Sequence, residues 1–335
     1  MNRISVIVPT HNRAEALNEC LISLAGQDYD KSAYEIIVVD NNSIDRTSEI
    51  VDGVCRLFPQ LNLRRVLETR EGLVYARHTG ALNASFDILS YTDDDATLDP
   101  RWLMEISSGF DRYENVSAVG GRIIIEWDSR PPEWIRPYEG YLGKIDYGPH
   151  EFVSTNININ GGNFSIKKDV LFELGGFNPD QVGEWLIGDG ENGLCKKLHK
   201  GNHRVAWAPN AIMYHHQTVK KNATLTDIAR RYANNGVAVP FHIYFVQKSG
   251  TLVLMLNLML AFGKIAFYFA LRLMFRMLNM DELSRKSLFK LHEYYSQVTY
   301  TLRICFDKPF RESIEQGDWI LAKPSSAKFK SVLRT

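Results

Sequence analysis

Three adjacent carboxylates, Asp93, Asp94 and Asp95, are the side chains of this sequence with the most evident chemical use. They follow Ile88–Thr92, a short apolar run typical of a buried strand. Neighbouring negative charges repel one another unless a cation lies among them, and oxygen ligands without a nearby cysteine suit Mg²⁺ or Mn²⁺. The alternative is a solvated acidic turn before the helix that begins at Pro100. The residue types alone leave both interpretations open.

The surrounding elements must place this acidic triplet. Ile4–Val8 and Ile36–Val39 are β-branched runs typical of buried parallel strands, and Ala14–Ala25 between them has helical spacing. The alternation continues through a helix over 47–57, a strand over 63–67, a helix over 73–84, a strand over 88–92 and a helix over 100–110. This order predicts an α/β fold with a doubly wound, mostly parallel sheet, whose ligands bind beyond the carboxyl ends of its strands. Thr10, Asp40 and the acidic triplet lie at those ends.

The second half of the chain has a different rhythm. Strands are expected over Val116–Ile125 and Asn156–Ile166, which are joined by the Pro-, Trp- and Tyr-rich segment Trp127–Tyr147. We expect a mixed sheet there, with a mobile loop at which a second substrate docks.

Composition and missing motifs exclude several classes of protein. Lys plus Arg (39) equals Asp plus Glu (39), so the chain lacks the positive field of a dedicated nucleic-acid binder. The first strand is followed by P-T-H-N-R from Pro9, which contains neither a dinucleotide fingerprint nor a P-loop. Four widely spaced cysteines indicate neither a zinc ribbon nor a disulfide framework. We therefore expect a reduced, cytoplasmic protein.

Several motifs occur in a specific order. They are V-I-V-P-T-H-N-R from Val6, V-V-D-N-N-S from Val38, E-G-L from Glu71, T-D-D-D from Thr92, G-G-N-F-S from Gly161 and G-E-N-G-L from Gly190. Over roughly residues 1–220 this set resembles the inverting family 2 glycosyltransferases of GT-A fold. The resemblance implies metal-dependent transfer from a nucleoside-diphosphate sugar, with a UDP-sugar favoured, to a saccharide or lipid-linked acceptor. Such a reaction belongs to the assembly of surface polysaccharides or glycolipids.

The resemblance also implies roles for individual residues. The positions implied to bind the donor are Pro9, Thr10, Asp40, Arg77, Asp93 and Asp94. Asp93 and Asp95 match the two ends of the family's D-x-D motif, which contacts the ribose and the metal, Mn²⁺ or Mg²⁺. His216 follows an apolar stretch and is implied to complete the metal shell, with a hydrogen-bonded structural histidine as the alternative.

The implied catalytic base lies in the stretch Gly188–Leu194. Glu191 stands where the family usually has aspartate, and Asp189 is the second candidate. The base would take the proton of the acceptor hydroxyl. The alternative for either acid is a helix cap or a first-turn acid. Trp185 is a candidate for stacking on a sugar, with core packing as the alternative.

The last third of the chain contains an apolar segment over 252–275. On a helical wheel its polar residues form a narrow stripe, which consists of Asn257, Lys264, Arg272, Arg276 and Asn279. Such a helix can lie in a membrane interface with its positive groups toward anionic headgroups. The alternative is a pair of helices packed on the catalytic domain or on a second subunit. Lys264 near the middle argues against a simple membrane span.

These observations predict four regions. They are a nucleotide-sugar-binding half over 1–115, an acceptor-binding and catalytic half over 116–222, a helical C-terminal extension over 223–321 that can contact a membrane, and a disordered tail over 322–335. We expect a cytoplasmic protein that can contact the inner face of the membrane. We expect no nucleic-acid partner, and the sequence is compatible with an oligomer. Two other functions stay open: a non-catalytic scaffold that binds nucleotide sugars, and a sugar-phosphate nucleotidyltransferase, which the missing glycine-rich loop disfavours.

Overall fold

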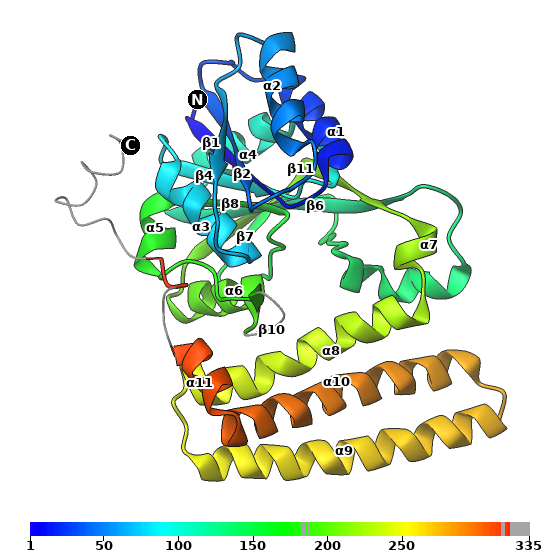
Figure 1. The fold of residues 1–335 in the computed structure, drawn as a ribbon. Coiled ribbons are helices and arrows are strands. Elements are labelled where there is room, and N and C mark those ends of the chain that lie inside the picture. The colour runs from blue at the N-terminus through cyan, green and yellow to red at the C-terminus, as the bar shows by residue number, and fades with distance from the viewer. Residues whose placement is uncertain (183–184, 187, 316–318, 322–335) are drawn as a thin grey trace.

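A nine-stranded sheet forms the centre of the molecule, with long helices below it in Figure 1. The structure is a computed structural model that describes residues 1–182, 185–186, 188–315 and 319–321. The strand order is β3-β2-β1-β4-β8-β6-β11-β5, and β7 pairs with β11. The first half is parallel and consists of β1 (Ile4–Thr10), β2 (Tyr34–Asp40), β3 (Leu63–Leu67) and β4 (Ile88–Thr92). β1, β2 and β4 are buried throughout, which explains their almost continuous apolar runs.

The second half of the sheet is mixed. β8 (Asn163–Lys167) runs antiparallel to β4 and to β6 (Val116–Trp127), whereas β11 (Arg204–Gln217) runs parallel to β6. The short strands are β5 (Ala96–Leu98), β7 (Phe152–Ser154), β9 (Gln181–Val182) and β10 (Trp185–Leu186). The predicted α/β class, with a parallel first half and a mixed second half, is therefore confirmed.

Helices cover both faces of the sheet, and the sheet separates the hydrophobic core into two clusters, one on each face. The helices on one face are α1 (Ala14–Ala25), α2 (Thr47–Leu57) and α4 (Trp102–Asp111), and those on the other are α3 (Leu73–Asn83), α5 (Lys168–Glu173) and α6 (Gly190–Lys200). Alternation along β1 serves both faces, because Val6 packs with Leu17 of α1 whereas Ile7 packs with Val74 of α3. The carboxyl ends of the parallel strands thus meet at one edge between the two helical layers.

Two segments differ from their prediction. The segment 127–147 is not simply a mobile loop, because it contains a 3₁₀-helix, η1 (Glu133–Leu142), whose Ile135 and Tyr138 are buried against later helices. The strand expected over 156–166 begins only at Asn163, since Asn160 accepts a hydrogen bond from the backbone N–H of Gly162 and forms a turn before it.

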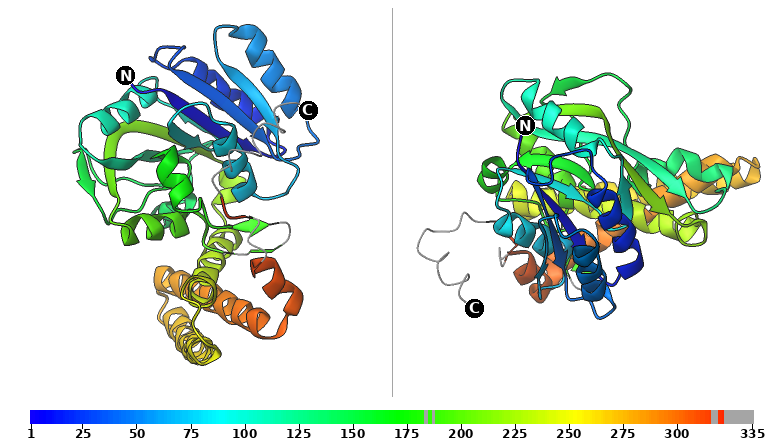
Figure 2. Two further views of the ribbon diagram at one scale, coloured as in Figure 1. Left: turned by 90° about the vertical axis from the view of Figure 1, so that its left-hand side faces the viewer. Right: turned by 90° about the horizontal axis from the view of Figure 1, so that it is seen from above.

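The C-terminal helices form a separate group below the sheet, visible in the left view of Figure 2. They are α7 (Val219–Asn222), α8 (Leu225–Phe241), the π-helical turn η2 (His242–Val246), α9 (Thr251–Met277), α10 (Asp281–Phe306) and α11 (Lys308–Glu315). The side-chain hydroxyl of Thr224 caps α8 by accepting a hydrogen bond from Asp227 N–H at 3.1 Å. Tyr232 of α8 and Phe289 of α10 pack with η1, which ties the helices to the sheet domain.

The predicted boundaries stay predictions. The sheet crosses the first of them, because β4 of the first half pairs with β8 of the second. The predicted tail over 322–335 lies outside the described residues. Within the described part of the chain, α9 alone has the length and composition of a helix that could cross a membrane, and it runs through Gly263 as one helix.

Candidate active site

A cleft lies beyond the carboxyl ends of β1 and β4. It consists of two adjoining cavities of about 660 and 740 Å³, which share residues of the sheet and of α8 in their walls. Pro9, Thr10 and the acidic triplet line the first cavity. Glu191, Asp189 and the end of η1 line the second. The fold thus brings the two groups of predicted site residues to one place, although about a hundred residues separate them in the chain.

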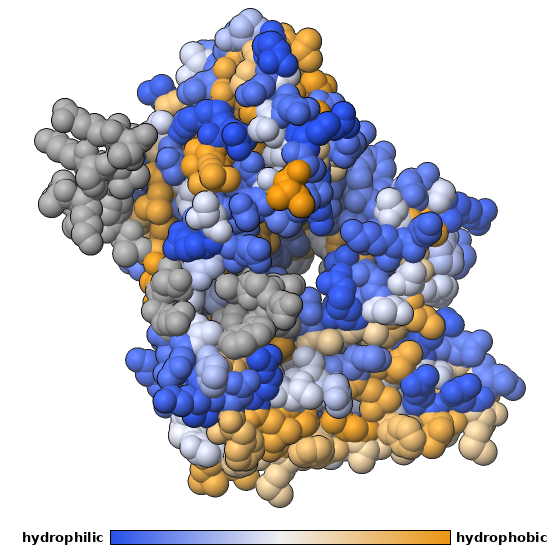
Figure 3. Space-filling model, in the orientation of Figure 1, coloured by the Kyte–Doolittle hydropathy of each residue, from blue (hydrophilic) through white to orange (hydrophobic). Residues whose placement is uncertain are grey.

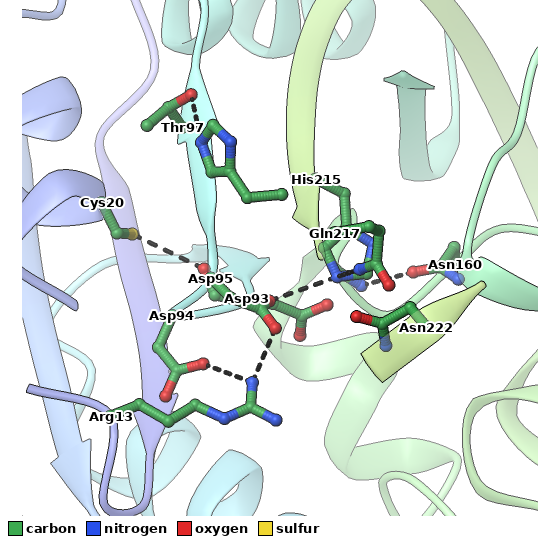
Figure 4. Close-up of polar contacts among 12 residues, drawn as sticks. Arg13, Cys20, Asp93, Asp94, Asp95, Thr97, Asn160, His215, Gln217 and Asn222 are labelled. Carbon is green, nitrogen blue, oxygen red and sulfur yellow. Dashed lines mark hydrogen bonds and ion pairs between the residues drawn. The ribbon is translucent and has the colours of Figure 1, made fainter. Parts of the chain in front are cut away.

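The acidic triplet points in two directions. Asp94 is buried, and its carboxylate accepts a hydrogen bond from Thr10 Oγ1 at 2.8 Å. Asp95 is only partly buried, and one of its carboxylate oxygens is 2.7 Å from Arg13 Nη1 while the other is 3.2 Å from His215 Nε2. Figure 4 shows Arg13 reaching both Asp94 and Asp95. The guanidinium of Arg13 therefore bridges Asp94 and Asp95.

The surroundings shift the pKa values of Asp94 and Asp95 in opposite directions. Burial raises the pKa of Asp94 to about 6, because a buried carboxylate loses solvation and the nearby charge of Arg13 only partly compensates. Burial acts in the same direction on Asp95, but the hydrogen bond and charge of His215 together with the charge of Arg13 outweigh it and lower the pKa of Asp95. Burial lowers the pKa of His215, but the hydrogen bond to Asp95 and the charges of Asp95 and Asp93 together raise it. The Asp95 carboxylate therefore stays ionised and attracts cations.

Asp93, Asp95 and His215 form a group that can hold a metal ion. One ligand atom of each lies within 4.8 Å of the others. Two carboxylates and an imidazole suit Mn²⁺, and the carboxylates suit Mg²⁺ as well. The guanidinium of Arg13 between Asp94 and Asp95 shows that the site accommodates positive charge. The donor set thus fits the predicted divalent cation.

The histidine of this group is not the predicted one. His216 Nε2 lies 3.0 Å from Thr97 Oγ1, and its Nδ1 lies 3.2 Å from a Glu126 oxygen. Neighbouring residues of a strand point to opposite faces, so β11 can turn only one of the pair toward Asp95. The structure places His215 there, whereas His216 contacts Thr97 and Glu126.

Two glycines let the base candidate and the triplet approach each other. A Cβ on Gly161 would overlap Glu191 and Arg77, and a Cβ on Gly162 would overlap Asp93. Gly161 N–H donates to Glu191 Oε2 at 2.9 Å. Arg77 bridges the two acids, with its Nη atoms 3.8 Å from Asp93 and 3.6 Å from Glu191. Arg77 thus lies between the two parts of the cleft and lines the second cavity.

Glu191 and Asp189 have different surroundings. Asp189 is fully buried, and its two oxygens accept hydrogen bonds from Asn178 Nδ2 at 2.6 Å and from Lys196 Nζ at 2.7 Å. The Glu191 side chain is 30% exposed, toward the cleft. Burial raises the pKa of Glu191, and the charge of Arg77 only partly opposes that effect. A carboxylate with a raised pKa and access to the cleft is better suited to accept a proton than one whose oxygens are both engaged.

The remaining donor candidates lie at different depths. Pro9 and Thr10 line the first cavity. The Asp40 carboxylate accepts hydrogen bonds from Ser43 N–H and Arg65 Nη1, both at 2.8 Å. Among the described residues at this strand end, its neighbour Asn41 lines the cleft. Trp185 belongs to β10, but its side chain lies outside the described residues.

With this geometry in place, the chain can be compared with known proteins. Residues 5–175, just over half of the chain, match the family described as Glycosyl transferase family 2. The chain belongs to this family. A glucosyl-dolichyl phosphate glucuronosyltransferase of Haloferax volcanii is 28% identical over 222 residues, which are 64% of this chain and 69% of that protein. Glycosyltransferase AglE of the same organism is 28% identical over 63% of this chain and 66% of its own length. The chain thus spans about two thirds of these relatives.

Solved structures show the same fold for this family 2 glycosyltransferase. A mannosyltransferase of Pyrobaculum calidifontis, solved with GDP-Man and Mn²⁺, has a TM-score of 0.54 at 19% identity and covers 95% of this chain and 84% of its own. TarS of Staphylococcus aureus, solved with UDP, has a TM-score of 0.51 at 18% identity, and the match covers 88% of this chain and 91% of the TarS chain. The predicted GT-A fold is therefore confirmed.

Several cleft residues of this family 2 enzyme were not predicted from the sequence. Arg13 is one of them, and Arg230 and Arg231 of α8 line both cavities. Both α8 arginines pair with Asp227 at 2.7 Å, so one acid partly neutralises two cations. No local motif marks α8, because it meets the cleft only through the tertiary fold.

We expect Gly161→Ala to reduce kcat about 100-fold, because the new methyl group must displace Glu191 or Arg77. Gly140→Ala is the matched control, since Gly140 also lines the second cavity but a Cβ there meets no atom within 4 Å. Steady-state kinetics on both variants check this prediction. Equal rates for the two variants would contradict the role of Gly161.

Proposed function

We propose that this glycosyltransferase moves a sugar from a nucleoside-diphosphate sugar to an acceptor hydroxyl with inversion at the anomeric carbon. The shared cleft carries the proposal, because Asp93, Asp95 and His215 lie at one end and Glu191 at the other. In an inverting transfer, the leaving group and the attacking hydroxyl act on opposite sides of one sugar. A metal-binding end and a basic end within one cleft support that reaction.

The donor would lie with its diphosphate near the acidic triplet. Asp93, Asp95 and His215 would hold Mn²⁺ or Mg²⁺, which when bound neutralises negative charge on the leaving diphosphate. Pro9 and Thr10 line the adjoining wall, where base and ribose would bind. Asp40 and Arg77 would contribute to donor binding only indirectly. Asp40 anchors the strand end, and Arg77 lies toward Glu191.

The acceptor would lie in the second cavity. There Glu191 would accept the proton of the acceptor hydroxyl while that oxygen forms its bond to the anomeric carbon and the bond to the diphosphate breaks. The hydrogen bond from Gly161 N–H and the nearby Arg77 orient the carboxylate. Asp189 holds the start of α6 through Asn178 and Lys196, so we propose it as a positioning residue.

Positive side chains on the opposite wall complement the phosphates. Arg230 and Arg231 line both cavities, and Lys221 of α7 lines the first. They line the same cavity as the acidic triplet, so a diphosphate bound there would meet these cations as well as a metal ion held by the carboxylates.

The acceptor class and the place of work are part of the proposal. A relative that acts on a glucosyl-dolichyl phosphate supports a lipid-linked acceptor, and a saccharide is the alternative. A UDP-sugar is the favoured donor. We propose that the protein works in the cytoplasm, at the inner face of the membrane, where such an acceptor is accessible.

A donor panel tests the function directly. Purified full-length chain is incubated with UDP-, GDP- and dTDP-sugars, with Mn²⁺, Mg²⁺ or chelator, and release of nucleoside diphosphate is measured. Thermal shift identifies the donor that binds, because a ligand of the folded state raises its stability. Metal-dependent release from one donor supports the proposal. Binding without release or transfer, across the panel and with lipid-linked acceptors, would contradict it.

A further inference from the structure

Helix α9 has its polar and apolar faces in the opposite arrangement from that of a water-exposed helix. Two residues of its polar stripe contact α10: Gln297 Nε2 donates to Asn257 Oδ1, and Lys264 Nζ lies 4.9 Å from the centre of the Tyr294 ring. Tyr268 stacks on the same ring, with the ring centres 5.6 Å apart. The neighbouring helix thus contacts polar residues of α9, while Lys264 keeps an exposed side chain.

The outward face of α9 is apolar along its whole length. Its exposed large side chains are Leu252, Val253, Leu256, Met259, Leu260, Phe262, Phe267, Phe269, Leu273, Met274 and Met277. Figure 3 shows this face as a continuous hydrophobic strip along the lower edge of the molecule. A helix of 27 residues is about 40 Å long, so the strip is larger than the apolar patches usual on soluble monomers. The outward face therefore fits an apolar phase better than water.

The charges of α9 favour a lipid surface as that phase. The helix contains no acidic residue, and its charged residues are Lys264, Arg272 and Arg276. These cations flank the apolar face, where they can meet the anionic headgroups of a bilayer into which that face inserts.

The position of α10 excludes a simple span. α10 lies along α9 and carries Glu282, Lys286 and Glu293, among other charged residues. If α9 crossed the bilayer with α10 attached, these charges would enter the hydrocarbon core at a large cost. An orientation parallel to the surface avoids that cost.

We propose that α9 is an in-plane docking helix, whose outward apolar face enters the surface of an anionic membrane while α10 and α8 hold the cleft above it. The proposal extends the proposed function by naming the surface and the class of lipid. The biological role of docking rests on the proposed function. The docking itself does not, because lipid binding is measured without turnover.

Vesicle flotation tests the proposal. The full-length chain is mixed with vesicles of phosphatidylcholine, with or without phosphatidylglycerol, and the floating fraction is measured. We expect binding that increases with the anionic lipid and decreases with salt. Arg276→Gln should weaken binding to the anionic vesicles about fivefold.

A pair of matched double variants gives the decisive comparison. Met259→Glu with Phe267→Glu places two charges on side chains that are 71% and 58% exposed, and binding should fall more than about tenfold. Leu57→Glu with Leu67→Glu makes the same change at side chains of the catalytic domain that are 69% and 56% exposed, and should bind like the wild type. All four side chains are at least half exposed, and circular dichroism checks that both variants fold.

Several results would overturn the proposal. One is a wild-type chain that does not float, or an α9 variant that floats as well as its control. Another is a dimer in solution that the α9 variant dissociates while no vesicle binding occurs, since a second copy then covers the face. Retention of the chain in membranes after alkaline carbonate extraction would indicate a span instead of a docked helix. Loss of glycosyl transfer with flotation intact would count against the proposed function and not against docking.

Discussion

Glu191→Gln will lower the rate of glycosyl transfer by about 10² to 10⁴-fold, because glutamine keeps the shape of the side chain but cannot accept a proton. The amide oxygen can still accept the hydrogen bond that Gly161 N–H donates at 2.9 Å, so the local fold should persist. Donor binding should change little, since the donor end of the cleft is lined by other residues. Turnover and donor affinity, measured on the same preparation, separate the two effects.

Asp189→Asn is the comparison for this prediction. Its carboxylate holds Asn178 and Lys196, so the variant should lose stability as well as activity, whereas Glu191→Gln should lose activity alone. If Asp189→Asn lost transfer at unchanged stability while Glu191→Gln stayed active, Asp189 would be the base.

The pH dependence of the wild type adds a second test. Only the deprotonated carboxylate can serve as the base, so the rate should fall as the pH decreases through the pKa of Glu191. Burial raises that pKa, so the fall should begin at a higher pH than for an exposed glutamate.

The fold and the acidic end of the site could be predicted from local pattern. The strands of the first half are buried on both faces, so each is an apolar run that ends at a polar residue, and Asp93 to Asp95 follow such a run. Because strand ends of a parallel sheet meet at one edge, sequence order alone placed Thr10 and the triplet together.

The rest depended on contacts between distant residues. Whether His215 or His216 points toward Asp95 depends on which face of β11 carries each side chain. Every second residue shares a face, so the buried Ala211 and Met213 share theirs with His215. The His215 side chain is 14% exposed, and that of His216 is 35% exposed. The alternation in twos was available in the sequence, but the burial of Ala211 and Met213 that sets its starting point was not. The orientation of α9 was not, because the direction of its polar stripe is set by Gln297 and Tyr294 of a later helix.

Asp95→Asn will reduce metal-dependent turnover by more than about 100-fold, because an amide is a weaker ligand for a divalent cation than a carboxylate and adds no charge. Titration with Mn²⁺ alone, followed by thermal shift, should show the weaker metal binding without any donor. His215→Asn should weaken Mn²⁺ binding more than Mg²⁺ binding, since imidazole suits Mn²⁺ better. Turnover and Mn²⁺ affinity that both stay at the wild-type level in Asp95→Asn would remove the metal from this end of the cleft.

A variant of Arg13 also tests the hypothesis that a metal ion binds at Asp95, because it should change the Mn²⁺ affinity in the opposite direction. Its guanidinium lies 2.7 Å from an Asp95 oxygen and 3.1 Å from an Asp94 oxygen, so it competes with a metal ion for the charge of Asp95. Arg13→Gln should therefore bind Mn²⁺ more tightly than the wild type, while Asp95→Asn binds it less tightly. A general loss of structure would weaken binding in both variants. Opposite shifts in the Mn²⁺ titration are expected if Arg13 and the ion compete for the carboxylates that follow β4, and equal shifts in the two variants would contradict that competition.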